Sequence, residues 1–219
     1  MTRAALAAIC GLAEESVLLK TALTHRSAAT PNSPSNERLE FLGDALLGAI
    51  VAEALFAQLP ETVDEGTLSR CRMQVVRRET LAEAGRALGL NTLLEVGEGE
   101  RREGRQSNDS LLADAYEALL GAIHCEVGLA RAQEFVQTTL GAAIVSVVAD
   151  PPTPDPKSAL QERLQAEKRG LPIYEVLSET LEEVRVAVRD ASGLPLGEGS
   201  GRSKRLATRD AARQALEQL

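Results

Sequence analysis

Four prolines fall within residues 149–158, whose sequence is ADPPTPDPKS. Proline fixes its own φ and pushes the preceding residue towards extended geometry, so neither a helix nor a central strand should run through this segment. A stiff, exposed linker is the natural interpretation. We therefore expect one domain over residues 1–149, a linker over residues 150–156 and a smaller second domain over residues 157–219.

The sequence before the linker predicts an all-α domain. Apolar residues recur at helical spacing in residues 80–94, 109–128 and 131–148, and few alternating runs occur there. Asp109 or Ser110 is expected to cap the second of these helices. Because aromatic residues make up only 2% of the chain, its core has to be built from Leu, Ala, Val and Ile.

After the linker the hydrophobic period changes. Residues 158–170 predict an amphipathic helix that ends at a glycine, and residues 203–219 predict a closing helix. Between them lies LPIYEVLSET, followed by VRVAVRD (residues 184–190), where three valines alternate with other residues as in a half-buried strand. LPLGEGSG, residues 194–201, predicts a third short strand and a Gly-rich turn. The order α-β-β-β-α indicates a small α+β domain.

Cysteine usage and hydropathy indicate a cytoplasmic protein with no membrane partner. Cys10, Cys71 and Cys125 are odd in number and form no CxxC pair, so we expect reduced and mostly buried thiols rather than disulfides or a zinc site. The N-terminus is too weakly apolar for a signal peptide. The uncharged run LGAAIVSVVA is about half the length needed to span a bilayer.

The net charge of −8 is unevenly distributed. From Asp155 onwards the chain has 11 basic and 11 acidic residues, so the first 154 residues carry 13 basic and 21 acidic residues and the whole excess. This total would not by itself suggest a nucleic-acid partner. Excess acid can instead indicate clustered metal ligands, whose charge is cancelled when cations bind.

Acidic residues interrupt the apolar stretch NERLEFLGDALLGAI. Glu37, Glu40 and Asp44 lie three, four and seven residues apart, which places them on one face of a helix. Like charges at this spacing repel, by a few tenths of a kcal/mol for each exposed pair and by more if they are buried. A solvated surface stripe would also explain the pattern.

A second acidic pair favours a metal centre. Asp114 and Glu117 lie three residues apart on another apolar helix. Two helices that each bring acids into an Ala/Leu-rich setting suit a site in a helical core. Hard oxygen ligands select Mg²⁺ or Mn²⁺, and such sites serve phosphoryl chemistry with an activated water. The spacing alone leaves a nuclease and a small-nucleotide hydrolase both open.

The motifs resemble those of a known family. NERLEFLGDALL closely resembles the defining motif of ribonuclease III, and ALTHRSA, VDEGTLSRCR and LLADAYEALLGAI fit the same family. The C-terminal unit resembles a double-stranded RNA-binding domain. The resemblance implies a Mg²⁺-dependent endonuclease, in which Mn²⁺ can substitute, that cuts double-stranded RNA. It further implies 5′-phosphate and 3′-hydroxyl ends, a short 3′ overhang and a role in RNA processing, including precursor ribosomal RNA.

The resemblance also assigns roles to residues. The core acids around the metal would be Glu40, Asp44, Asp114 and Glu117, of which Asp44 and Glu117 would be catalytic. Glu37 and Glu65 match supporting acids near the cleavage site. The family's nuclease domain is a homodimer, and Phe41 occupies the position of an aromatic that packs into the partner; an ordinary core aromatic is the alternative.

In the second domain, the resemblance implies RNA contacts from two helices. The residues implied are Gln161, Glu162 and Gln165 in the first helix, and Arg202, Lys204 and Arg205 at the start of the closing helix, with assistance from Arg209. Side chains of the first kind suit 2′-hydroxyls, and helix N-termini suit phosphate. The loop between the first two strands departs from the pattern, because it is short and contains Glu179, Glu182 and Glu183. We therefore expect weaker RNA affinity than in a strongly basic homologue.

The two histidines are poor catalytic candidates, and two other functions are alternatives to this interpretation. His25 is expected to fix a helix end or a loop by hydrogen bonding, and His124 to be a satisfied interior residue. A catalytically silent duplex-RNA binder is one alternative, although all four core acids are present. An all-α nucleotide pyrophosphohydrolase with Mg²⁺ is another, although it would have no use for the second domain.

Overall fold

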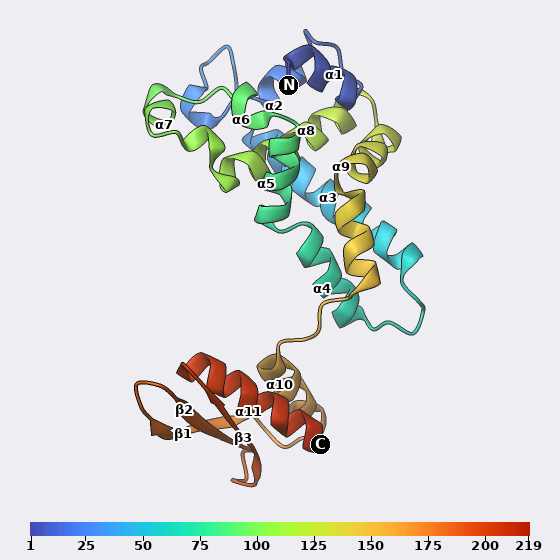
Figure 1. The fold of residues 1–219 in the computed structure, drawn as a ribbon. Helices are drawn as coiled ribbons and strands as arrows, with labels where there is room; N and C mark the ends of the chain where they lie inside the picture. Colours follow the sequence, from blue (N-terminus) through green and yellow to red (C-terminus); the bar gives the residue numbers. More distant parts are fainter. The chain divides into compact units, whose positions relative to one another are not determined.

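A computed structural model describes residues 1–219, which form two compact units, Met1–Pro152 and Thr153–Leu219. The first unit is helical and the second has the order α-β-β-β-α (Figure 1), which confirms the predicted fold class. The elements of the first unit are α1 (Arg3–Cys10), α2 (Val17–Ala22), η1 (Arg26–Ala28), α3 (Glu37–Gln58), α4 (Glu65–Val75), α5 (Arg78–Ala87), α6 (Leu90–Leu93), α7 (Glu98–Arg102), η2 (Arg105–Ser107), α8 (Asp109–Glu126) and α9 (Leu129–Ala149).

Helix α8 is the central element of the first unit. Its residues from Leu112 to Ile123 are mostly buried, and α3, α5 and α9 pack around it. Tyr116 and Phe135 are the large aromatic side chains of this core, with ring centroids 5.3 Å apart. The rest of the core is made of Leu, Ala, Val, Ile and Cys side chains, as the composition predicts.

The start of α8 differs from the expectation. Neither Asp109 nor Ser110 is the N-cap; Asn108 is, and its side chain accepts a hydrogen bond from the backbone N–H of Ser110 at 2.8 Å. Asp109 is the first helical residue and pairs with Arg86. Asn and Asp are about equally good N-caps, so the sequence left the choice between adjacent residues undecided.

Helix α9 is long and apolar enough to cross a membrane by length and composition alone. One face of it, which includes Phe135, Leu140 and Ile144, is nevertheless buried in the core of the first unit. The buried residues of α9 pack against α8, α3 and α4.

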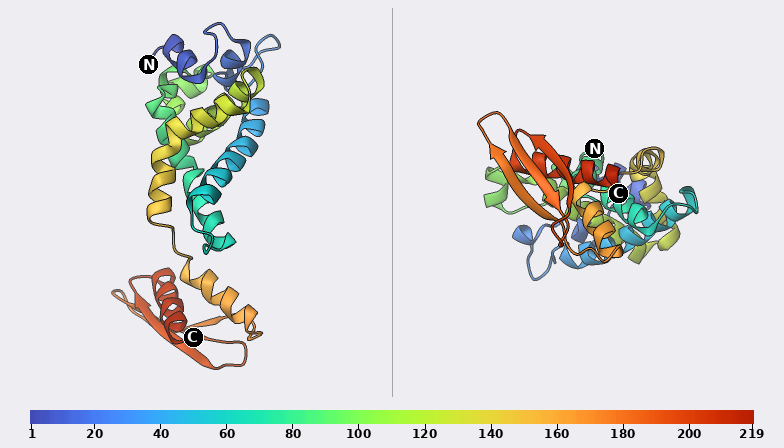
Figure 2. Two further views of the ribbon diagram at one scale, coloured as in Figure 1. Left: turned by 90° about the vertical axis from the view of Figure 1, so that its right-hand side faces the viewer. Right: turned by 90° about the horizontal axis from the view of Figure 1, so that it is seen from below.

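The second unit is a three-stranded antiparallel sheet with two helices on one face (Figures 1 and 2). Its elements are α10 (Pro156–Ala166), β1 (Ile173–Glu179), β2 (Val184–Arg189), β3 (Pro195–Gly201) and α11 (Lys204–Gln218). Val184, Val186 and Val188 are buried against the helices, which confirms the alternation predicted for this strand.

Two details of the second unit correct the sequence analysis. The last proline of the proline-rich segment belongs to a helix, because α10 begins at Pro156 and Asp155 caps it. Proline is tolerated at the first position of a helix, where a backbone N–H would have no partner within the helix. The Gly-rich segment is part of β3 itself rather than a turn. A Cβ on Gly199 would lie 2.5 Å from the carbonyl carbon of Asp210, so glycine is needed for α11 to lie against the strand.

Candidate metal centre

The structure gathers acids where α3 crosses α8. One carboxylate oxygen each from Glu40, Asp114 and Glu117 lies within 4.8 Å of the others, and all three residues are half-buried. Glu40 comes from the first turns of α3, and the other two come from the middle of α8. The two acidic helices that the spacing predicts therefore meet at these three carboxylates.

The other predicted acids lie outside this cluster. Asp44 is exposed on α3, and its charge raises the pKa of both Glu117 and Glu40. Glu37 is exposed at the start of α3, where it accepts a hydrogen bond from Ser35 Oγ at 2.8 Å. Glu65 lies at the start of α4 and accepts one from Ser69 Oγ at 2.7 Å. Within one chain, therefore, Asp44 and Glu37 border the cluster and Glu65 belongs to a different surface.

Burial and mutual repulsion favour the protonated form of these acids. Burial raises the pKa of Glu117 to about 8, and the charges of Asp44, Asp114 and Glu40 add to the effect. Burial also raises the pKa of Glu40, followed by its acidic neighbours. The pKa of Asp114 is raised by burial too, although the charge of Arg78 opposes the shift. No hydrogen bond to any of the three offsets this cost.

A polar pocket of about 400 Å³ opens beside the cluster. Its lining residues are His25, Arg26, Asn36, Glu37, Glu40, Ser110, Leu111 and Asp114. Arg26, together with Arg78 nearby, gives one side of the acidic site a positive rim. The helical spacing of the acids does not predict this role of Arg26, because Arg26 belongs to a separate element, η1. The available signal was the ALTHRSA motif, which contains Arg26.

The two histidines have different outcomes. His25 caps η1, and its Nδ1 accepts a hydrogen bond from the backbone N–H of Ser27, so the predicted loop-fixing role is confirmed. His124 is half-buried and its Nδ1 has no hydrogen-bond partner, so the expectation of a satisfied interior residue was wrong. Sequence position predicts burial of this residue but not the partners that meet it.

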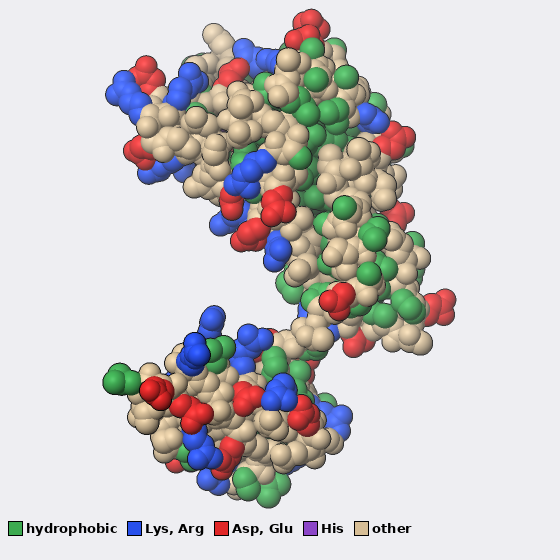
Figure 3. All heavy atoms as spheres, viewed as in Figure 1, with side chains coloured by type: hydrophobic (Ala, Val, Ile, Leu, Met, Phe, Trp, Pro, Cys, Tyr) green, Lys and Arg blue, Asp and Glu red, His purple; other side chains and the backbone are tan.

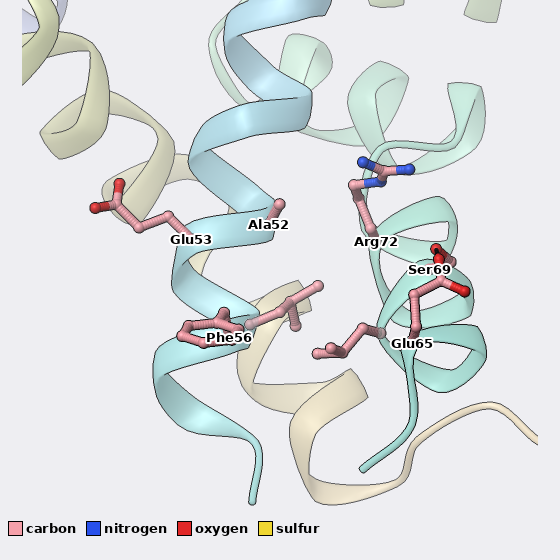
Figure 4. A pocket seen from close by; sticks show the side chains of 8 residues that line it. Ala52, Glu53, Phe56, Glu65, Ser69 and Arg72 are labelled. Carbon is pink, nitrogen blue, oxygen red and sulfur yellow. Dashed lines mark hydrogen bonds between the residues drawn. The ribbon is translucent and has the colours of Figure 1, made fainter. Parts of the chain in front are cut away.

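Phe41 is 81% exposed and is therefore not an ordinary core aromatic of its own chain. A second exposed aromatic, Phe56, lies 15 residues further along α3 at the edge of a pocket of about 370 Å³ between α3 and α4 (Figure 4). The pocket is lined by Ala52, Glu53, Leu55, Phe56, Glu65, Leu68, Ser69 and Arg72. The surface of α3 thus offers both a protruding aromatic side chain and a mostly apolar cavity.

The side chains expected to contact RNA are all exposed on the second unit. Gln161, Glu162 and Gln165 lie on the outer side of α10, and Arg202, Lys204 and Arg205 lie at the start of α11 without ion-pair partners. Arg209 instead pairs with Asp155 at 3.2 Å. The connection from β1 to β2 is the tight turn of residues 180–183. Acidic and basic side chains are interspersed on the visible face of this unit (Figure 3).

The chain thus combines a helical domain, whose converging acids could hold a metal ion, with a small α-β-β-β-α domain, and this combination defines its structural class. Comparisons with known proteins agree. The Ribonuclease-III-like family model matches residues 15–144, and the double-stranded RNA binding motif matches residues 156–219. The chain belongs to the ribonuclease III family.

Relatives match most of the chain. Ribonuclease 3 of Xylella fastidiosa strain M23 is 42% identical over 206 residues, which cover 92% of this chain and 89% of that protein. Ribonuclease 3 of Vibrio cholerae is 41% identical over 210 residues, covering 94% and 92%. Among solved structures, a nuclease domain of ribonuclease III from Campylobacter jejuni, described with a region involved in dimer formation, has a TM-score of 0.58 and 34% identity, and covers 63% of this chain and 95% of that chain.

Proposed function

We propose that this chain is a Mg²⁺-dependent endoribonuclease that cuts double-stranded RNA and leaves 5′-phosphate and 3′-hydroxyl ends with a short 3′ overhang. Its role would be RNA processing in the cytoplasm, including precursor ribosomal RNA. The observation that carries the proposal is the convergence of Glu40, Asp114 and Glu117 in a chain that also has a double-stranded RNA-binding domain.

The donor set fits a hard divalent cation. Three carboxylates offer oxygen ligands, there is no histidine or cysteine among them, and their mutual repulsion is relieved when a cation binds. Mg²⁺ suits such a site, and Mn²⁺ can substitute. A bound cation would offset negative charge on the phosphate and lower the pKa of the attacking water.

The chain's own residues would divide the remaining work. Glu40, Asp114 and Glu117 would hold the cation, and Asp44 at the border of the cluster would complete the core acids. Because its pKa is about 8, the Glu117 carboxyl holds a proton near neutral pH in the absence of a cation and has to lose it to become a ligand. The second unit would hold the duplex by its backbone and 2′-hydroxyls, a mode of binding that needs no sequence-specific contacts.

We also propose that the nuclease units form a two-fold dimer through α3. Phe41 and Phe56 are about 22 Å apart along this helix, so Phe41 cannot reach the pocket beside Phe56 of its own chain. Two antiparallel copies of α3 would place each Phe41 in the partner's pocket. On the face of α3 that carries the two aromatics, the residues between them are Ala45, Gly48, Ala49 and Ala52, which are exposed or half-buried and small enough to allow a close approach.

This dimer would give Glu65 a place in the site. Glu65 lines the pocket that would receive Phe41, and Phe41 directly follows Glu40 in the sequence. Each cleavage site would then combine the acids of one chain with Glu65 from the other. This arrangement accounts for an acid that lies on a different surface from the cluster within one chain.

The activity is tested with long duplex RNA and Mg²⁺. We expect the unmodified protein to produce short duplexes, and Glu117→Gln to lower the cleavage rate by about 10³-fold or more while it still binds the duplex. EDTA should stop cleavage by the unmodified protein. Glu83→Gln, which neutralises an exposed acid of α5, is the matched control and should cleave normally. Binding without any cleavage by the unmodified protein would favour the silent duplex binder instead.

The dimer is tested with Gly48→Leu, measured by light scattering. A Cβ placed on Gly48 would meet nothing within 4 Å in the single chain, so the backbone there has open space beside it and the substitution should leave the fold intact. Gly48 lies midway between Phe41 and Phe56, where the two copies would be closest, so we expect monomers and a large loss of cleavage. A dimer of unchanged affinity would contradict this packing of α3.

A further inference from the structure

The helices that carry the acids approach each other closely at two glycines. A Cβ placed on Gly43 of α3 would lie 2.5 Å from the carbonyl carbon of Glu117, and nearer still to its oxygen. A Cβ placed on Gly121 of α8 would lie 3.1 Å from the carbonyl carbon of Leu39, and again nearer to the oxygen. In both cases the obstacle is backbone, which cannot rotate away as a side chain can.

These two contacts are reciprocal and involve the acidic residues. Gly43 lies three residues after Glu40 and packs directly against the backbone of Glu117. Gly121 lies one turn after Glu117 and packs directly against the backbone of Leu39, the residue before Glu40. Each glycine therefore sits against the part of the other helix that positions an acid of the cluster.

Glycine in the middle of a helix is destabilising relative to alanine, so two such glycines require a packing reason. Helices that pack through ordinary side chains have axes about 8–10 Å apart. Small residues at a crossing allow the backbones to come closer. Here the closer approach brings together carboxylates that repel one another. Packing of the apolar side chains alone would not require the carboxylates to be so close.

We propose that Gly43 and Gly121 are positioning residues that set the distance between the two acid-bearing helices, and with it the affinity of the acids for a divalent cation. The inference rests on the proposed metal-dependent function. A methyl group at either position would place Cβ under 3.0 Å from a carbonyl oxygen, a separation that real Cβ atoms essentially never show, so the helices would have to move apart. The carboxylates would move apart with them.

The test compares Gly121→Ala and Gly43→Ala with two control variants in the full-length protein. Gly141→Ala in α9 would meet only the flexible side chain of Gln137. Gly85→Ala in α5 would meet the backbone oxygen of Leu112 at 3.1 Å, so it disturbs another face of α8 away from the acids. Folding is checked by circular dichroism, and Mn²⁺ binding without RNA is measured by electron paramagnetic resonance.

We expect Gly121→Ala to weaken Mn²⁺ binding at least tenfold, because changes in the residues that orient metal ligands typically cost about 10–100-fold in affinity. Gly43→Ala should weaken binding further, since its Cβ would lie nearer to a carbonyl oxygen. The Mg²⁺ concentration at half-maximal cleavage should rise in parallel. Both controls should bind Mn²⁺ within about twofold of the unmodified protein, even where Gly85→Ala lowers the melting temperature.

Three results are distinguishable. If folded Gly121→Ala binds Mn²⁺ as tightly as Gly141→Ala, the positioning role is overturned. If neither glycine variant folds while Gly85→Ala does, it is also overturned, because the glycines would then be required for the fold rather than for the spacing of the acids. If the unmodified protein binds no Mn²⁺, or if Glu117→Gln does not weaken binding, the proposed metal-dependent function fails instead.

Discussion

Glu117 in the first unit is half-buried and Asp190 in the second is buried, but the surroundings of these two acids are opposite. Burial and neighbouring acids raise the pKa of Glu117 to about 8. Hydrogen bonds from Ser192 and Arg169 lower the pKa of Asp190 to about 2. The fold of the second unit supplies every donor that Asp190 needs, whereas the fold of the first unit supplies Glu117 with further acids and no donor.

The same difference extends to the surroundings of each residue. On the outer face of the sheet, Arg185 pairs with Glu198 at 2.9 Å and Arg189 with Glu175 at 3.7 Å, so the charges there are balanced by the chain itself. At the crossing of α3 and α8 the balance has to come from outside. Acids that the fold satisfies are structural, and acids that it crowds together indicate a ligand of opposite charge.

The largest effect expected from this comparison is on the stability of the first unit. The folded-state pKa of Glu117 lies above its ordinary value of 4.5, so the folded state binds more protons and its stability falls as the pH rises from about 4.5 to about 8. Without a divalent cation, we expect thermal unfolding of the first unit to occur about 5–10 °C lower at pH 8.5 than at pH 5.5. Differential scanning calorimetry in EDTA measures this shift.

Mg²⁺ should reverse the loss at high pH, because it binds the ionised carboxylates of the folded state. Glu117→Gln should remove most of the pH dependence and should unfold at a higher temperature than the unmodified protein at pH 8.5 without a cation. A melting temperature of the first unit that does not depend on pH between 5.5 and 8.5 would show that Glu117 is not crowded as described.

A smaller effect is expected in the second unit. The folded-state pKa of Asp190 lies below its ordinary value of 3.8, so its contribution to stability is present above that pH and is lost as the pH falls through about 2. Asp190→Asn should lower the melting temperature of the second unit by about 5 °C at pH 7, since it removes the charge that faces Arg169. The loss should shrink towards pH 2.

Mg²⁺ should not restore the stability of Asp190→Asn. Glu217→Gln is a suitable control, because it neutralises an exposed acid of α11 that pairs with Arg213 on the surface. If Asp190→Asn melts like this control, the stability of the connection between β2 and β3 does not depend on the buried Asp190 carboxylate. Asp190 would then not be an acid with a structural role, and the contrast with Glu117 would fail.

The sequence predicted which helices would carry the site, because a period of three and four residues fixes the face on which an acid lies. It could not predict that Asp44 would lie outside the cluster of three carboxylates. That depends on where α3 crosses α8, and the crossing is set by Gly43 and Gly121, whose role needs both helices in place. Periodicity along one helix does not show where that helix crosses another or how closely the two helices pack.

The second unit shows the same limit. Alternating valines predicted β2, because that pattern is local. The glycines in residues 194–201 predict a turn beside a third short strand, since Gly-rich segments commonly form turns. These glycines are needed because α11 lies close against the strand. That contact involves a helix later in the sequence, so Gly199 and its neighbours do not reveal it.

The smallest predicted effect concerns the turn between β1 and β2. Glu182 and Glu183 are exposed there, beside Leu181, which is fully exposed, and no basic side chain lies in the turn. An acidic tip of this kind repels phosphate, so Glu182→Lys with Glu183→Lys should tighten duplex-RNA binding several-fold in the Glu117→Gln background. Binding is measured by fluorescence anisotropy over a range of salt concentrations.

The salt dependence of binding identifies the reason for any gain. Each lysine that reaches a phosphate should steepen the slope of log K against log salt by about 0.9. Glu182→Lys alone is also compared with Glu217→Lys, near the far end of α11 from Lys204 and Arg205, which is the matched charge change and should leave the slope unaltered. An equal gain from both variants would mean that the overall charge of the unit matters rather than the turn. The acids of the second unit would then affect RNA binding only through its total charge, whereas those of the first unit act at one defined site.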